Sequence, residues 1–172
     1  HRPRGDYFIL TSRLRPYKKI DIAIRAFNRL NMPLYIIGEG EEEAKLRAIA
    51  GPSIKFLGAL NDEDKKFYLA GAQGFINPQE EDFGIAAVEA MAGGTPVIAF
   101  EAGGARETVI PDITGVFFEE QTWQSLSDAV IRFRRLSWDY SRIRDHAQQF
   151  SEERFIREMK NFVEIKYMER QD

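Results

Sequence analysis

Two short segments of the sequence carry opposite charges, each directly after an apolar run. The segment that follows Tyr7–Leu10 reads Thr-Ser-Arg-Leu-Arg-Pro-Tyr-Lys-Lys and supplies Arg13 and Lys18. The segment that follows Gly74–Asn77 reads Pro-Gln-Glu-Glu-Asp-Phe-Gly and supplies Glu81. Cationic side chains bind phosphate oxygens, whereas a carboxylate accepts hydrogen bonds from neighbouring sugar hydroxyls. Together the segments predict a site for a ligand that carries both phosphates and a sugar.

A second glutamate, Glu89, lies eight positions after Glu81, and Gly84–Ala92 has the composition of a helix. At about 1.5 Å of rise per residue, the two carboxylates would lie roughly 12 Å apart along the helix axis. An acid and a base that act on one glycosidic bond lie about 5 to 10 Å apart, so this spacing is too long for such a pair. It fits a ligand with a sugar at one end, a ribose at the other and a diphosphate between them, which is the shape of a nucleotide sugar.

Six short apolar runs are predicted to be the strands that position these segments. Several are apolar at successive positions, which is typical of strands buried on both faces of a parallel sheet. Helix-like stretches such as 20–30, 61–70 and 84–92 separate them. The pattern predicts an α/β, doubly wound, Rossmann-like domain with a six-stranded parallel sheet, and its usual order, 3-2-1-4-5-6, would place the two charged segments at one crevice. The runs are Tyr7–Leu10, Leu34–Ile37, Ile54–Leu57, Gly74–Asn77, Pro96–Phe100 and Gly115–Phe118.

The last third of the chain is predicted to be a helical tail. One apolar stripe at helical spacing runs from Leu126 to Phe133, and a second follows Ser151, a suitable cap residue. The second stripe, which we expect to pack, consists of Phe155, Met159, Phe162, Val163 and Tyr167. The arginines of the tail have two interpretations, a solvated face or contact with an anionic membrane surface. They are Arg132, Arg134, Arg135, Arg142 and Arg144.

The composition excludes several classes of function. The chain has 172 residues, a formal net charge of −3 and no cysteine. The charge argues against a nucleic-acid partner, and the missing cysteines exclude disulfides, thiolate metal sites and a cysteine nucleophile. No apolar run approaches the length of a membrane span, so we expect a cytoplasmic protein, with peripheral contact at the membrane face as an alternative. Because the chain begins with His1 rather than Met, we expect it to start inside a longer gene product.

The segment Glu-Asp-Phe-Gly-Ile-Ala-Ala-Val-Glu-Ala-Met-Ala, residues 81–92, resembles the Glu-x7-Glu signature of the retaining glycosyltransferases of family 4, the glycosyl transferases group 1, which have the GT-B fold. Ser12-Arg13-Leu14 with Lys18 is similar to the basic phosphate-binding loop of that family. The resemblance covers roughly residues 7 to 165. It implies that residues 1–172 are a single C-terminal donor-binding domain, one half of a GT-B fold, without the N-terminal acceptor domain and inactive alone.

The resemblance also implies a role for each charged residue. Arg13 and Lys18 are expected to clamp the donor diphosphate and to stabilise the charge that develops as the nucleotide leaves. Glu81 is expected to contact hydroxyls of the transferred sugar, and Glu89 those of the ribose. The predicted catalytic residues are therefore Glu81, Arg13 and Lys18. No metal and no cofactor besides the donor is implied, because the basic loop and a helix N-terminus do the work of a divalent cation.

Backbone groups complete the donor site that the resemblance implies. The amides of Phe83, Gly84 and Ile85 are expected to face the phosphates and the sugar. For the remaining glycines two interpretations stay open, an ordinary turn or a close approach of the backbone to the donor. The predicted donor-binding residues are Phe83, Gly84, Ile85, Glu89, Gly38, Gly103 and Gly104.

The expected function of the full enzyme is the transfer of a hexosyl unit, of the mannose or glucose type, from a nucleoside diphosphate to an acceptor hydroxyl. Glu-Glu-Asp-Phe-Gly-Ile is similar to mannosyltransferase-like members that use GDP-mannose, and UDP-sugars stay open. One alternative is a GT-B epimerase of nucleotide sugars, which would act without an acceptor. Another is a non-catalytic nucleotide-sugar-binding module, in which loss of the Glu81 carboxylate would leave transfer unaffected. The expected partners are the donor and the protein's own N-terminal domain.

Overall fold

The computed structural model describes residues 4–170, within which six parallel strands form one sheet in the order β3-β2-β1-β4-β5-β6. His1 lies outside the described residues. The predicted order is confirmed, and each strand lies within one or two residues of its predicted position. Register is continuous between β1 and β2, where Phe8 pairs with Leu34 and Thr11 with Ile37. The strands are β1 Phe8–Thr11, β2 Leu34–Ile37, β3 Ile54–Gly58, β4 Phe75–Asn77, β5 Val97–Phe100 and β6 Gly115–Phe118.

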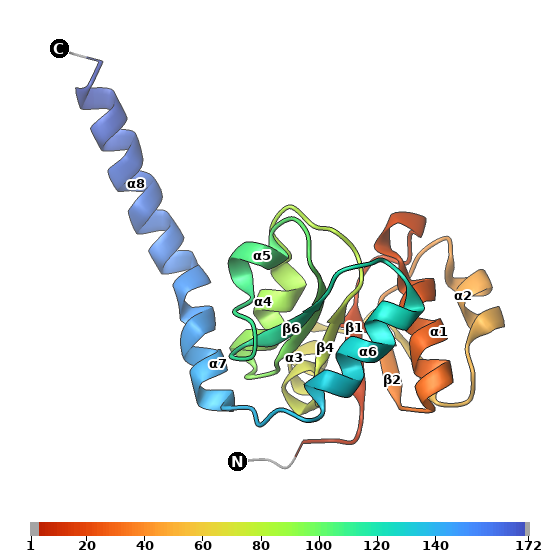
Figure 1. Ribbon diagram of the computed structural model, residues 1–172. Coiled ribbons are helices and arrows are strands. Elements are labelled where there is room, and N and C mark those ends of the chain that lie inside the picture. Colours follow the sequence, from red (N-terminus) through yellow and green to blue (C-terminus); the bar gives the residue numbers. More distant parts are fainter. Residues whose placement is uncertain (1–3, 171–172) are drawn as a thin grey trace.

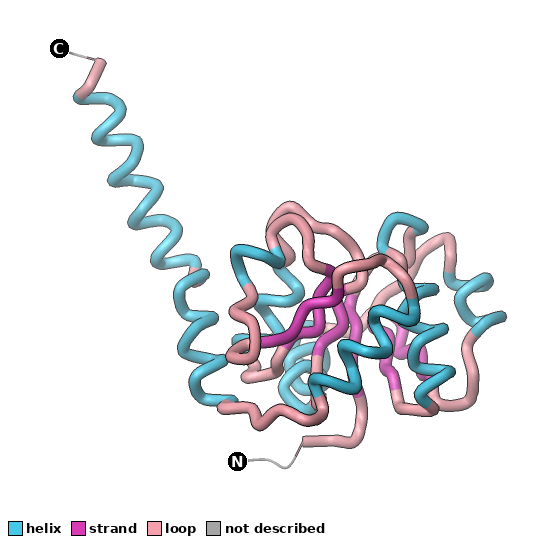
Figure 2. The backbone as a smooth tube through the Cα atoms, in the orientation of Figure 1, coloured by secondary structure: helices cyan, strands magenta, loops and turns pink. Residues whose placement is uncertain are grey.

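Helices cover both faces of the sheet, as Figures 1 and 2 show. Helices α1, α2 and α6 pack on one face, and α3, α4, α5 and α7 pack on the other. The helices are α1 Ile20–Leu30, α2 Glu43–Ile49, α3 Asp62–Gly71, α4 Ile85–Ala92, α5 Ala105–Thr108, α6 Trp123–Phe133, α7 Tyr140–Ala147 and α8 Glu152–Met168, with short 3-10 turns η1 Pro16–Lys18 and η2 Gln148–Phe150. The doubly wound, Rossmann-like fold is thus confirmed.

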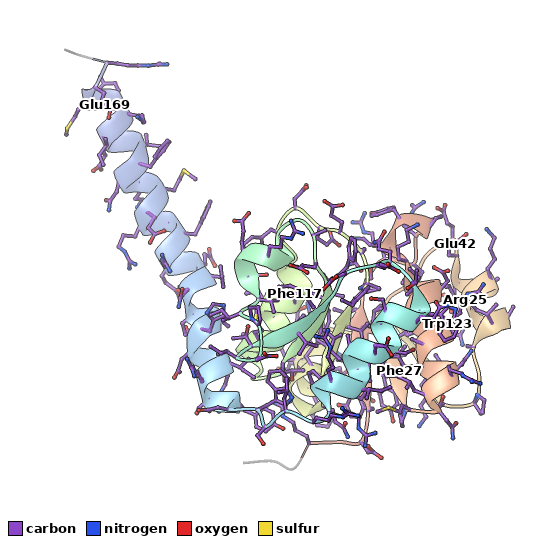
Figure 3. All side chains as sticks on the ribbon, in the orientation of Figure 1. Arg25, Phe27, Glu42, Phe117, Trp123 and Glu169 are labelled. Atoms are coloured by element: carbon purple, nitrogen blue, oxygen red, sulfur yellow. The ribbon has the colours of Figure 1, made fainter. Side chains whose placement is uncertain are left out.

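Each face of the sheet has its own hydrophobic core, because successive side chains of a strand point to opposite faces. In β1, Phe8 and Leu10 enter the core shared with α1 and α6, whereas Ile9 enters the other. Phe27 of α1 is fully buried, and its ring centroid lies 5.1 Å from that of Phe8. Figure 3 labels Phe27 on α1 and Trp123 on α6, two of the three helices of this face. Strands β1 and β4 are parallel neighbours in the sheet, so their carboxyl ends lie side by side.

The tail corrects one expectation. The stripe of α6 is buried as predicted, with Leu126 and Val130 fully enclosed. Ser151 also caps α8, since its hydroxyl accepts a hydrogen bond from the backbone N–H of Arg154. The prediction that the second stripe packs is wrong, however, because every described residue of α8 from Phe155 onward is exposed. Helix α8 extends away from the sheet domain (Figure 1), so its apolar side chains have no core to enter.

The arginine-rich part of the tail lies at α6 and α7. Arg132 donates a hydrogen bond of 2.6 Å to the carbonyl oxygen of Phe117, which ties α6 to β6. None of the helices in residues 4–170 combines the length and the apolarity needed to cross a membrane. Peripheral contact of this surface with a membrane stays a prediction.

Candidate functional site

A cleft of about 420 Å³ opens between the carboxyl ends of β1 and β4. Parallel strands that flank a reversal in sheet order leave such a crevice, because their connections depart to opposite faces. The two charged segments form its walls, and the start of α4 closes it. Its lining residues are Thr11, Ser12, Arg13, Tyr17, Lys18, Asn77, Gln79, Glu81, Asp82, Phe83, Gly84, Ile85 and Ala86.

The basic wall of the cleft is a loop held rigid at both ends. Leu14 is fully buried, and its backbone N–H donates to the carbonyl oxygen of Glu39 at 3.0 Å. Pro16 then begins the turn η1, and Lys18 lies at its last position. Arg13 and Lys18, at either side of this anchored segment, both line the cleft.

The acidic wall presents Glu81 to Lys18. Their side chains form an ion pair across the cleft, with the Lys18 Nζ atom on Oε1 of Glu81. The side chains are 13% and 27% exposed, so water screens this pair less than a surface pair. Gln79 donates a second hydrogen bond, of 2.8 Å, to the same carboxylate oxygen. The structure therefore brings the predicted catalytic residues Arg13, Lys18 and Glu81 into one cavity.

Helix α4 directs its N-terminus at this cleft. Gly84, at φ +85°, is the N-cap residue of this helix, and within the described residues no side chain caps the helix with a hydrogen bond. The first N–H groups of a helix have no partner within it, and the helix dipole favours an anion at this end. Phe83 and Ile85, beside Gly84, are 44% and 67% exposed. The predicted backbone cradle at residues 83–85 thus lines the cleft.

The predicted glycines lie against neighbouring loops. A Cβ atom on Gly38 would lie 1.9 Å from the carbonyl oxygen of Ser12, and one on Gly103 would lie 2.3 Å from that of Glu81. Gly104 is buried, and its N–H donates to the Glu81 carbonyl oxygen at 2.7 Å. The close backbone approach at these glycines is therefore to the loops that carry Arg13 and Glu81. Direct contact of Gly38, Gly103 and Gly104 with a donor stays a prediction.

Replacing Gly104 by alanine should disturb the acidic wall. The added Cβ atom would lie 2.4 Å from the Asp82 carbonyl oxygen and 2.6 Å from the Phe83 Cα atom, so the backbone has to shift. Overpacking of this kind is expected to lower the free energy of unfolding by about 1–2 kcal/mol. Chemical denaturation measures the change, with Glu107→Ala, an exposed change on α5, the helix that Gly104 precedes, as control. Equal unfolding free energies for Gly104→Ala and the unmodified chain would contradict the prediction.

Glu89 lies in a neighbouring pocket and not in the cleft itself. This pocket, of about 410 Å³, is formed by α3 and α4 and includes Asp62, Lys65 and Leu69. The Lys65 Nζ atom lies 3.0 Å from Oε1 of Glu89 and 3.7 Å from Oδ1 of Asp62. Glu81 precedes α4 and lines the cleft, whereas Glu89 lies on α4 and lines the second pocket, and each is paired with a lysine from another element. The spacing of roughly 12 Å predicted along one helix axis therefore does not apply, because only Glu89 is on the helix.

Sequence reasoning missed Gln79 and Lys65. Nothing in the sequence marks a glutamine in a polar loop as buried, and its burial depends on β4 and on the neighbouring connections. Lys65 lies on the helix predicted from Asn61, but the sequence does not show that this helix packs beside the one that carries Glu89. Across residues 4–170, no three carboxylate or histidine side chains gather as a metal site would require.

Residues 1–151 match the family model described as glycosyl transferases group 1. A curated relative is the GDP-mannose-dependent monoacylated alpha-(1-6)-phosphatidylinositol monomannoside mannosyltransferase of Corynebacterium glutamicum, which is 38% identical over 136 residues. That match covers 70% of this chain and 35% of the relative. The chain thus spans about a third of the length of the curated relatives it matches.

Solved structures show the same architecture. The lipopolysaccharide outer core galactosyltransferase WaaB superposes with a TM-score of 0.83 over 95% of this chain and 52% of its own, at 17% identity. HepE of Anabaena, in complex with UDP and glucose, superposes with a TM-score of 0.71 over 88% of this chain and 44% of its own, at 25% identity. The likeness to WaaB shows the shared fold, which is that of one half of a GT-B glycosyltransferase.

Proposed function

Because this chain belongs to the glycosyl transferases group 1 family, we propose that it binds the nucleotide-sugar donor of a retaining hexosyl transfer. The observation that carries the proposal is the convergence in one cleft of two cations, a helix N-terminus and a carboxylate. The cations and the helix suit a diphosphate, and the carboxylate suits sugar hydroxyls. The ion pair between Lys18 and Glu81 joins the basic and the acidic wall of the cleft, which supports the assignment of both walls to one site.

In the proposed reaction, the bond between the anomeric carbon and the diphosphate oxygen breaks, and the diphosphate takes the electron pair. Arg13, Lys18 and the N-terminus of α4 stabilise the negative charge that develops on it, which a divalent cation does in other transferases. The acceptor oxygen then bonds to the anomeric carbon on the same face, and its proton passes to the diphosphate oxygen that has left. Glu81 holds hydroxyls of the sugar throughout.

The adjacent pocket extends the proposed donor site along α4. Glu89 accepts hydrogen bonds from the ribose hydroxyls in this proposal. Its present partner is Lys65. A carboxylate has acceptor positions on both oxygens, so Glu89 can keep Lys65 on Oε1 while Oε2 receives a hydroxyl.

We propose GDP-mannose as the donor. The relative from Corynebacterium glutamicum is named as GDP-mannose-dependent and shares 38% of its residues with this chain over the matched region. HepE, with UDP and glucose bound, is 25% identical and supports UDP-glucose as the second candidate. Since the chain spans about a third of its relatives, we propose that the full-length protein adds an acceptor-binding domain and that this chain alone is inactive in transfer.

Calorimetry with GDP, GDP-mannose, UDP and UDP-glucose tests the proposal on the 172-residue chain. We expect GDP and GDP-mannose to bind, with GDP-mannose tighter because its sugar reaches Glu81. Tighter binding of UDP-glucose would move the donor assignment to that class. Absence of binding by all four compounds would contradict the proposed function.

A further inference from the structure

Gln79 lies in the acidic wall of the cleft and has no role in the proposed function so far. The residue is 5% exposed and lines the cleft. Its side-chain nitrogen Nε2 donates a hydrogen bond of 2.8 Å to Oε1 of Glu81, the oxygen that also receives the ammonium group of Lys18. Two donors from different elements therefore converge on one oxygen of the carboxylate.

The orientation of the Gln79 amide follows from the chemistry of its partner. An ionised carboxylate only accepts hydrogen bonds, so the NH₂ end of the amide has to face Glu81. In this orientation the amide oxygen Oε1 is buried and finds no donor among residues 4–170. Buried acceptors without a partner are rare, because nothing replaces their lost hydration. The amide thus keeps its contact with Glu81 although its own oxygen remains unpaired.

We propose that Gln79 is a positioning residue, which holds the Glu81 carboxylate in place for the hydroxyls of the donor sugar; this rests on the proposed function. A bound diphosphate competes with Glu81 for the charge of Lys18. The neutral amide of Gln79 is not drawn to the phosphates in the same way. Gln79 therefore remains on Oε1 when Lys18 turns to the diphosphate, and the other acceptor positions of Glu81 stay available to the sugar.

The test compares the affinities of GDP-mannose and GDP, measured by calorimetry on the 172-residue chain. Their ratio reports what the sugar adds to binding. Gln79→Met keeps the length of the side chain and removes the donor, and we expect it to lower the ratio about tenfold while GDP affinity stays within about twofold. In a Glu81→Gln background, Gln79→Met should have no further effect, because the carboxylate it positions is gone.

A second variant and a matched control keep the test decisive. Gln79→Glu preserves the shape and replaces the donor by a second carboxylate, so it should lower the ratio at least as much as Gln79→Met. The control is Gln121→Met, because Gln121 donates to the Pro78 carbonyl oxygen at 3.1 Å and thus contacts the same loop away from Glu81. This control should leave the ratio unchanged.

Three results would overturn the positioning role while the proposed function stands. They are an equal loss of GDP and GDP-mannose affinity in Gln79→Met, an equal effect of Gln121→Met, and a full effect that survives in the Glu81→Gln background. Each would make Gln79 a purely structural residue. If the unmodified chain binds neither nucleotide, the proposed function itself fails, and the positioning role fails with it.

Discussion

Replacing Glu81 by glutamine is expected to lower hexosyl transfer by the full-length protein at least about a hundredfold. The change keeps the size of the side chain and removes the negative charge that Lys18 and Gln79 hold in the cleft. Sugar hydroxyls would then face an amide, half of whose hydrogen-bonding capacity is donor instead of acceptor. The rate of transfer is measured as the release of GDP from GDP-mannose in the presence of acceptor. The same variant of the 172-residue chain should bind GDP at least as tightly as the unmodified chain, because Glu81 faces the sugar in the proposed complex and the variant no longer competes with the diphosphate for the charge of Lys18.

Glu80→Gln is the matched control for this experiment. Glu80 precedes Glu81, carries the same charge and is exposed to solvent. Like Glu81→Gln, Glu80→Gln removes one negative charge near the cleft, but it removes no contact with the ligand. Transfer by this variant should therefore stay near the unmodified rate. Equal transfer rates for Glu81→Gln and the unmodified protein would contradict the catalytic role of Glu81, and absence of transfer by the unmodified full-length protein would favour a non-catalytic nucleotide-sugar-binding module. Conversion of a UDP-sugar without acceptor would instead favour an epimerase.

The fold could be predicted from the sequence because its signals are local. The runs at 34–37 and 115–118 are apolar at nearly every position, and the strands occupy these residues as predicted. Helix α5 could not be predicted in the same way, since its four residues are too few to show a period. The helix α8 itself was predicted, but the prediction that its apolar stripe packs was wrong for another reason. Periodicity shows that a helix has an apolar face, but it does not show that a surface is present to cover that face.

In the candidate site, too, some features could be predicted from the sequence, whereas others depend on packing. The opposed charges of Lys18 and Glu81 could be predicted to meet, because the sheet order brings the first and fourth loops together. The neighbouring pocket of Glu89 could not, since it depends on how α3 packs on α4 and on the reach of Lys65. Gln79 shows the limit most clearly. Its proposed role depends on burial and on one hydrogen bond, and neither can be predicted from residue types or their spacing.

Replacing Lys18 by alanine is expected to weaken binding of GDP and GDP-mannose to the 172-residue chain by about 10- to 100-fold. A lysine ammonium forms charge-assisted hydrogen bonds with phosphate oxygens, and the variant loses them. It also leaves the Glu81 carboxylate without its ion-pair partner in the cleft, and that charge repels the diphosphate. Both effects weaken the nucleotide part of the ligand. The two ligands should therefore lose affinity by the same factor, in contrast to Glu81→Gln, which acts on the sugar.

The repulsive part of this loss can be separated from the attractive part. In a Lys18→Ala, Glu81→Gln double variant the unpaired carboxylate is gone, so GDP should bind more tightly than it binds to Lys18→Ala alone. Raising the ionic strength should weaken GDP binding less in Lys18→Ala than in the unmodified chain, because one of the attracting charges is missing. Lys19→Ala is the control, since Lys19 is next in sequence but does not line the cleft. If Lys18→Ala and Lys19→Ala bind GDP equally well, the diphosphate does not lie against η1, and the cations that stabilise the leaving nucleotide have to be sought elsewhere.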